Sequence, residues 1–187
     1  GKSTLLNKLV NEKISIVTFK PQTTRDNILG VLTDKNFQIA FIDTPGILKV
    51  KDGLSRYMMN NVKDASLSAD IVLYTISDET GADDADFRFI NNLKNSGLTV
   101  IVLLTKIDSR DKFKTAENLN SLNNVDCEVI PVSSHKNINI DTLIKVITDN
   151  LPEGEKLFDE DFITDKSLKF MCAEILREKL MLSLDKE

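Results

Sequence analysis

The sequence has few of the residues that build metal, redox or disulfide sites. Its 187 residues include two cysteines, one histidine and no tryptophan. Cys127 and Cys172 stand in apolar stretches without the spacing of metal ligands, so we expect two buried, reduced thiols in a cytoplasmic protein. His135 lies in a polar turn, where a solvent-facing position is more common than a catalytic one. The chemistry of the chain is therefore expected to rest on other side chains.

Long apolar runs are absent as well. No uninterrupted run approaches the length of a membrane span, and no charged segment followed by an apolar one marks a secretory leader. The formal net charge of −5 disfavours a surface that coats nucleic acid generally. From Pro152 onward the sequence holds ten acidic and six basic residues. An RNA-binding surface is therefore expected to be a local patch or to lie outside these residues.

Short β-rich apolar runs alternate with longer helical patterns, which indicates an α/β fold with a mostly parallel, doubly wound sheet. The continuous apolar run Val100–Leu104 predicts a central strand covered on both faces. Asn36 suggests a hairpin and hence one antiparallel pair. The expected strands are Ile28–Thr33, Phe37–Ile42, Ile71–Ile76, Thr99–Leu104 and Glu128–Val132. The expected helices are Leu5–Val10, Leu54–Leu67, Ala85–Asn95, Lys114–Leu122, Asp141–Asn150 and Ser167–Leu184.

The first residues match the end of a phosphate-binding loop, G-x-x-x-x-G-K-[ST]. In that loop, backbone N–H groups surround a pyrophosphate, the lysine reaches the β- and γ-phosphates, and the Ser or Thr hydroxyl holds Mg²⁺. Lys2 and Ser3 fill the last two roles, with Gly1 and Thr4 beside them and a helix following. We expect the loop's first glycine, and the strand before it, to lie outside these residues. Alone the match is weak, because the same residues can open any helix.

A second motif follows the expected strand Phe37–Ile42. An acidic residue at the end of a strand can hold Mg²⁺ through water, and a glycine nearby lets its N–H approach a γ-phosphate. An ordinary turn is the alternative, since this residue order is also good turn chemistry. The phosphate loop upstream favours the functional interpretation. The residues concerned are Asp43, Thr44, Pro45 and Gly46, with Ile47 next to them.

Two motifs at the ends of later strands predict recognition of guanine. Asp108 can accept hydrogen bonds from both N1–H and N2–H of guanine, a contact that adenine does not offer. The stem of Lys106 can cover the base, while Ser133 and Ser134 can present backbone N–H groups to the guanine O6. A polar strand end is the alternative for the first motif, which consists of Thr105, Lys106, Ile107 and Asp108.

A threonine between the first helix and the next strand is the remaining predicted metal ligand. In the run Pro21-Gln22-Thr23-Thr24-Arg25, a threonine can complete the Mg²⁺ shell only when a γ-phosphate is present, which makes the segment a switch. We choose Thr24, with Thr23 as the near alternative. The predicted metal ligands are Ser3, Thr24 and Asp43, and the predicted catalytic residues are Lys2, Thr24 and Gly46.

The order of these motifs resembles that of translation-factor-like small GTPases, and further segments are similar to the bacterial Era family. The resemblance covers essentially the whole chain and implies a P-loop GTPase that converts GTP to GDP and phosphate with Mg²⁺, with K⁺ as a further candidate cofactor. It also implies small ribosomal subunit assembly through small-subunit ribosomal RNA, in the cytoplasm, with peripheral association at the inner face of the membrane left open. The segments are Asn11–Val17, Pro21–Arg25, Asp43–Ile47, Phe158–Ser167 and Glu174–Leu180.

The resemblance also implies how the chain divides. Residues 1–151 would form a GTPase domain without its first strand and the start of its phosphate loop, and residues 152–166 a linker marked by Pro152 and Gly154. Residues 167–187 would form the first helix of a KH-type α+β domain, whose G-x-x-G loop lies outside this sequence. That helix carries an apolar stripe of Leu168, Met171, Cys172, Ile175, Leu176 and Leu180.

Three residues differ from those that related GTPases usually have at these positions, and they bear on the activity that we expect. Thr105 replaces the family's usual asparagine, which implies a looser tie to the phosphate loop while guanine binding survives. Ser134 replaces alanine and leaves its backbone N–H available. Ile47 stands where Ras-like GTPases place the glutamine that orients the attacking water, so we expect slow hydrolysis without a side-chain general base.

Other functions stay open at this point. One is a guanine-nucleotide binding module that recruits a partner without significant hydrolysis. Another is a different GTPase of the same superfamily, and a third is an ATPase or small-molecule kinase that uses the same loop. Phosphate release with and without ribosomal subunits separates the first from a hydrolysing switch, and nucleotide competition tests the last.

Overall fold

The computed structural model describes residues 1–18, 23–24, 26–46, 65–66 and 68–184. The chain forms two compact units. The first consists of Ala69–Glu153 together with Gly1, and the second of the described residues within Lys2–Ser68 and Gly154–Glu187. Residues distant in sequence thus share the second unit, which joins the N-terminal helix to the C-terminal one.

The first unit is built on three parallel strands. β3 (Ile71–Ser77), β4 (Thr99–Thr105) and β5 (Glu128–Val132) pair in that order. β4 lies in the middle, and each of its residues after Thr99 is buried. The prediction of a central strand covered on both faces is therefore confirmed.

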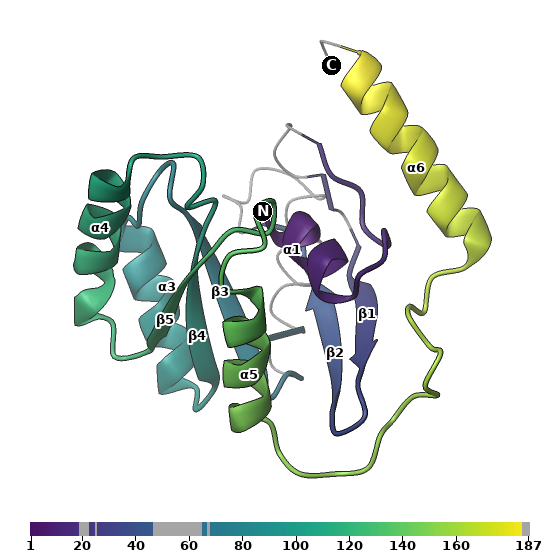
Figure 1. The fold of residues 1–187 in the computed structure, drawn as a ribbon, viewed down its shortest axis with the longest axis horizontal. Helices are drawn as coiled ribbons and strands as arrows, with labels where there is room; N and C mark the ends of the chain where they lie inside the picture. Colours follow the sequence, from purple (N-terminus) through teal and green to yellow (C-terminus); the bar gives the residue numbers. More distant parts are fainter. Residues whose placement is uncertain (19–22, 25, 47–64, 67, 185–187) are drawn as a thin grey trace. The chain divides into compact units, whose positions relative to one another are not determined.

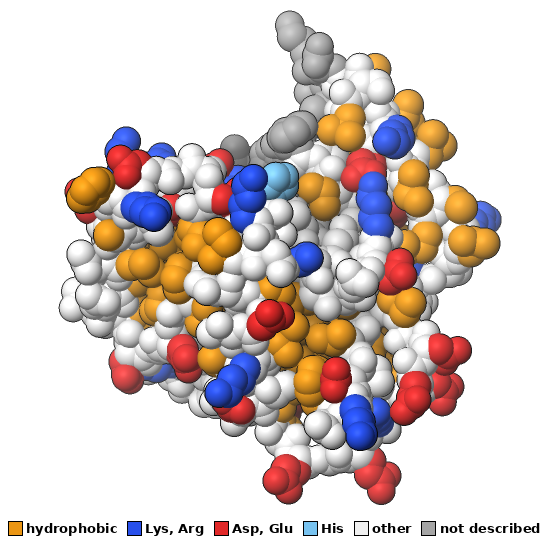
Figure 2. Space-filling view, viewed as in Figure 1, with side chains coloured by type: hydrophobic (Ala, Val, Ile, Leu, Met, Phe, Trp, Pro, Cys, Tyr) orange, Lys and Arg blue, Asp and Glu red, His pale blue; other side chains and the backbone are white. Residues whose placement is uncertain are grey.

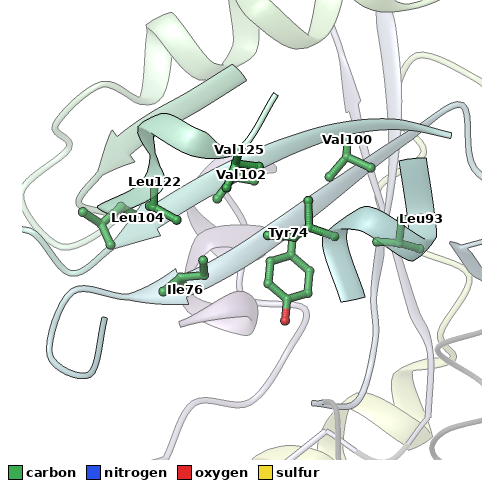
Figure 3. Close-up of a cluster of buried hydrophobic side chains, with 9 residues drawn as sticks. Tyr74, Ile76, Leu93, Val100, Val102, Leu104, Leu122 and Val125 are labelled. Atoms are coloured by element: carbon green, nitrogen blue, oxygen red, sulfur yellow. The ribbon is translucent and has the colours of Figure 1, made fainter. Parts of the chain in front are cut away.

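Helices cover both faces of this sheet. They are α3 (Asp84–Asn95), α4 (Lys112–Ser121) with the 3-10 turn η1 (Leu122–Asn124), and α5 (Ile140–Asn150). α3 and α5 lie on opposite sides of the sheet (Figure 1). Alternate residues of β3 and β4 meet α3 and η1 in one hydrophobic core (Figure 3). This core contains Tyr74, Ile76, Ile90, Leu93, Val100, Val102, Leu104, Leu122 and Val125.

The second unit places α1 (Lys2–Leu9) against an antiparallel hairpin of β1 (Ile28–Thr33) and β2 (Gln38–Asp43). A Cβ built on Gly30 would lie only 2.5 Å from Ile14 Cδ1, so glycine permits the close approach of β1 to the chain after α1. The predicted hairpin is confirmed. Its small core contains Leu6, Val10, Ile14 and Ile28, with Phe41, Phe170 and Met171 packed against it.

The segment after Gly154 runs beside strand β1 of the hairpin and leads into α6 (Leu168–Ser183). The Val31 N–H donates to the Ile163 carbonyl at 2.8 Å, and the Thr164 hydroxyl donates to the Leu29 carbonyl at 2.6 Å. These bonds complete the outer edge of β1. Figure 2 shows hydrophobic side chains gathered along α6, where Leu168 is 80% exposed and Leu176 is 62% exposed.

Most predicted elements are confirmed. The strands, and the helices after residue 80, differ from their predicted ends by at most two residues, whereas the predicted helix Leu54–Leu67 falls almost entirely outside the described residues. The prediction of two buried thiols was wrong, because Cys127 is partly buried and Cys172, on the open stripe of α6, is exposed; neither forms a disulfide. Among the described residues, no helix is both long and apolar enough to cross a bilayer.

Candidate functional site

The three predicted metal ligands come together in the second unit. Ser3 lies in the first turn of α1, and Asp43 is the last residue of β2. The Ser3 hydroxyl donates to Asp43 Oδ2 at 2.6 Å and lies 3.0 Å from Thr24 Oγ1. Asp43 is 5% exposed and Thr24 8% exposed. Ser3 is partly buried, so the cluster is a largely buried group of hydroxyl and carboxylate oxygens.

One oxygen of this cluster lacks a hydrogen bond. Asp43 Oδ1 is buried and accepts none from the described residues. A buried carboxylate oxygen without a donor is costly, so a cation fits this position. Mg²⁺ takes oxygen ligands, and one carboxylate with substrate phosphates and waters is a usual set. Since no group of three or more His, Cys, Asp or Glu suited to a metal occurs in the described part of the chain, a protein-only metal cage is not seen there.

Lys2 and Gly46, two predicted catalytic residues, lie side by side. A Cβ built on Gly46 would lie 3.6 Å from Lys2 Nζ. An ammonium group and a glycine backbone beside the N-terminus of α1 suit an anionic phosphate. Of the neighbouring predicted residues, Pro45 is fully buried and Thr4 and Thr44 are partly buried. Ile47 lies outside the described residues.

Asp108 and Ser133, predicted to recognise guanine, meet in the first unit. The Ser133 hydroxyl donates to Asp108 Oδ1 at 2.5 Å and accepts from the Lys136 N–H at 3.0 Å. This hydrogen bond from Ser133 lowers the pKa of Asp108 against the opposing effect of burial, with support from the nearby charges of His135 and Lys136. Asp108 is therefore ionised at neutral pH and ready to accept hydrogen bonds.

The turn between β4 and Asp108 has an unusual backbone. Lys106 has a φ of 63°, which is uncommon for a residue with a side chain. Its ammonium forms an ion pair with Glu79, while the Thr105 hydroxyl donates to the Ile76 carbonyl at 3.0 Å. Ile107 packs against the core of this unit. The Thr105 hydrogen bond and the packing of Ile107 therefore hold this turn, whereas the half-exposed ion pair of Lys106 adds little. Asp108 is the next residue along the chain.

Gly1 and the residues after β5 are further neighbours of Thr105 and Asp108. A Cβ built on Gly1 would lie 3.6 Å from Thr105 Oγ1, so Thr105 lies near the phosphate-loop glycine. Ser134 is partly buried. The His135 side chain is 79% exposed and its Nδ1 lies 3.9 Å from Asp108 Oδ2. The expectation of a solvent-facing histidine is confirmed.

Sequence reasoning missed Ser15, which contacts the metal cluster, and two residues of α6 that contact the chain between α1 and β1. The Ser15 hydroxyl donates to Asp43 Oδ2 at 2.9 Å. From α6, Arg177 donates to the carbonyl of Thr23 at 2.8 Å, and Glu178 accepts from the Val17 N–H at 3.0 Å. None of these three contacts has a pattern in the sequence, since Ser15 is a lone serine between isoleucines and the α6 contacts span more than 150 positions.

Comparison with known proteins identifies the family. The family model described as 50S ribosome-binding GTPase matches residues 1–106. GTPase Era of Clostridium tetani is 42% identical over 190 residues, which cover 100% of this chain and 64% of that protein. The chain belongs to this GTPase family. GTPase Era of Clostridium botulinum (strain Okra) is 41% identical, again over 64% of its length.

Solved Era structures share the fold. The crystal structure of Era with MgGDPNP and nucleotides 1506–1542 of 16S ribosomal RNA matches with a TM-score of 0.94 and 39% identity. A variant of Aquifex aeolicus Era bound to GDP·AlF4⁻ matches with a TM-score of 0.93 and 38% identity. Each match covers 100% of this chain and 65% of the Era chain. The predicted P-loop GTPase fold is therefore confirmed, over about two thirds of the length of these relatives.

Proposed function

We propose that the chain is the nucleotide-binding part of an Era-type switch, which binds GTP with Mg²⁺, hydrolyses it slowly and acts in small ribosomal subunit assembly through small-subunit ribosomal RNA. The observation that carries the proposal is the cluster of Ser3, Thr24 and Asp43, in which one buried carboxylate oxygen has no hydrogen-bond partner among the described residues. Support for both ligands comes from the Era structure with MgGDPNP and a 16S ribosomal RNA segment, at a TM-score of 0.94.

At the phosphate end, Lys2 binds the β- and γ-phosphates, with Gly1 and Thr4 beside it. Ser3 and Thr24 supply hydroxyl ligands to Mg²⁺, and Asp43 holds it through water. When bound, Mg²⁺ neutralises charge that develops on the phosphate oxygens. The backbone N–H of Gly46 donates toward the γ-phosphate, with Thr44, Pro45 and Ile47 adjoining, and Lys2 stabilises the same negative charge.

At the base end, Asp108 accepts N1–H and N2–H of guanine, and backbone N–H groups of Ser133 and Ser134 donate to O6. Support comes from the hydrogen bond between Ser133 and Asp108, which keeps the carboxylate ionised and positioned. Bound adenine would cover these groups without pairing with them, at a cost that makes recognition selective. Thr105, Lys106 and Ile107 hold the turn that places Asp108.

Hydrolysis in this proposal is slow. Lys2, Gly46 and Mg²⁺ stabilise charge, while no described side chain is assigned as a general base. K⁺ is a candidate additional cofactor. Single-turnover hydrolysis by the full-length protein should run well below about 1 s⁻¹ without a partner. Phosphate release that stays absent even with ribosomal subunits would favour the binding-module alternative instead.

The proposal divides the chain into a GTPase domain over residues 1–151, a linker over 152–166 and the first helix of a KH-type domain over 167–187. Support comes from the exposed stripe of α6, which the rest of such a domain would cover. The relatives are longer than this chain by about a third of their length. An RNA partner of this kind fits a cytoplasmic location, and nothing in the described residues bears on membrane association.

Nucleotide competition on the full-length protein tests the proposal. GTP should displace bound fluorescent GDP, whereas ATP should fail at a thousandfold higher concentration. Asp108→Asn should weaken GDP binding by about tenfold to a hundredfold and favour xanthine nucleotides, because the amide donates where the carboxylate accepts. Asp149→Asn, at an exposed position of α5, is the matched control and should change nothing. Displacement by ATP as effective as by GTP would overturn the assignment of Asp108.

A further inference from the structure

Asp43 is oriented by a residue outside the nucleotide motifs. Its Oδ2 accepts from Ser3 at 2.6 Å, from Ser15 at 2.9 Å and, at the long distance of 3.5 Å, from Thr24, while Oδ1 accepts from no described residue. Ser3 is a metal ligand in the proposed function, so its hydroxyl has a second role. Ser15 is 1% exposed and has no such competing role, which leaves its hydroxyl available to hold one fixed carboxylate oxygen.

Asn7 holds Ser15 in place. Its Oδ1 accepts from the N–H groups of Ile14 at 3.0 Å and Ser15 at 2.9 Å, and its Nδ2 donates to the Ser15 carbonyl at 2.7 Å. Ile14 and Ile16, on either side of Ser15, are 4% and 3% exposed. The backbone of Ser15 is therefore fixed by side-chain hydrogen bonds and by burial of both neighbours.

α1 links this support to the metal cluster. Ser3 and Asn7 are separated by one helical turn and lie on the same side of α1. The helix therefore presents one proposed metal ligand directly and fixes the carboxylate through Ser15. Groups that orient a metal-binding carboxylate in this way usually matter for metal affinity nearly as much as the ligands do.

We infer that Ser15, held by Asn7, is a positioning residue that fixes the Asp43 carboxylate so that Oδ1 serves the magnesium site. This inference rests on the proposed function. Without the Ser15 hydroxyl, the carboxylate can rotate and Oδ1 loses its defined position. The effect falls on metal binding and not on the contacts that hold the nucleotide itself.

The test measures release of fluorescent GDP from the full-length protein while Mg²⁺ is titrated. Ser15→Ala should raise the Mg²⁺ concentration that half-maximally slows release by about tenfold or more. Release in EDTA should stay as in the wild type, and so should the midpoint of thermal unfolding without nucleotide. Asn7→Ala should shift the Mg²⁺ dependence in the same direction. Ser121→Ala, at the exposed end of α4, is the matched control and should behave as the wild type.

The outcomes separate the inference from the function it rests on. If wild-type release depends on Mg²⁺ but Ser15→Ala leaves that dependence unchanged, the inference is wrong and the proposed function stands. If Ser15→Ala speeds release equally in EDTA and in Mg²⁺, Ser15 has only a general structural role and the inference is again wrong. If wild-type release ignores Mg²⁺, the inference and the magnesium site of the proposed function are both overturned, while guanine recognition by Asp108 is tested separately by nucleotide competition.

Discussion

The two carboxylates predicted to bind the nucleotide are held in different ways. Asp43 is 5% exposed and shares one oxygen among hydroxyls from distant parts of the second unit. The Asp108 side chain is 21% exposed and is held by a hydrogen bond from Ser133, at the end of the adjacent strand. The position of Asp43 depends on burial and on contacts between distant segments, and that of Asp108 on the turn that follows the central strand β4.

This difference predicts which substitutions should affect the stability of the fold and which should affect recognition of the nucleotide. The contacts of α6 with the rest of the second unit, such as the hydrogen bond between Glu178 and the Val17 N–H, hold α6 to the chain after α1 and to the small core, so their loss should weaken the fold. The contact at the guanine end fixes one carboxylate without tying distant segments, so its loss should change affinity and pH dependence. Glu178→Gln should therefore mainly lower stability, whereas Ser133→Ala should mainly lower the affinity for guanine nucleotides.

The largest effect on stability is expected from Glu178→Gln. Burial raises the pKa of Glu178, but the hydrogen bonds from Lys13 and the Val17 N–H outweigh it, so the pKa lies below its usual value of 4.5. A lowered pKa stabilises the folded state above the unfolded pKa, and this contribution disappears as pH falls through the folded pKa. We expect Glu178→Gln to lower the free energy of unfolding by about 1–3 kcal/mol at pH 7.

Denaturant unfolding of the full-length protein at several pH values measures this effect. The difference between Glu178→Gln and wild type should shrink below about pH 4.5, as the wild-type carboxylate becomes protonated. Glu160→Gln is the control in the same unit, since its side chain is 87% exposed and its ion pair with Lys156 is worth little. If Glu178→Gln and Glu160→Gln lowered the free energy of unfolding equally, burial of Glu178 would not explain its effect, and this account would be contradicted.

Ser133→Ala is expected to have a smaller effect, which falls on the affinity for guanine nucleotides and its pH dependence. The pKa of Asp108 should rise toward its ordinary value when the Ser133 hydrogen bond is removed. Guanine binding requires the carboxylate, so affinity should fall by about fivefold to tenfold at pH 7, and its loss on acidification should begin at a higher pH than in the wild type. GDP binding measured from pH 4 to pH 8 checks both. A binding profile that keeps the wild-type pH dependence would contradict this account.

The sheet of the first unit could be predicted from the sequence because its strands are mainly apolar, most clearly in the continuous run Val100–Leu104 of the central strand. Ser3, Asp43 and Asp108 could be found because each belongs to a motif with a recognisable residue order. Ser15 could not, since a lone serine in an apolar segment has no periodicity or spacing. The buried Glu178 could not either, because the same helix carries an apolar stripe that predicts a different packed face.

The most direct test of the central claim is to locate the metal in a crystal of the full-length protein with a non-hydrolysable GTP analogue and Mn²⁺ in place of Mg²⁺. The anomalous signal should show one ion about 2.1 Å from Ser3 Oγ, with Asp43 bonded to a water on that ion. An ion that contacts neither Ser3 nor a water held by Asp43, or a bound analogue without any ion, would contradict the assignment of this cluster as the magnesium site.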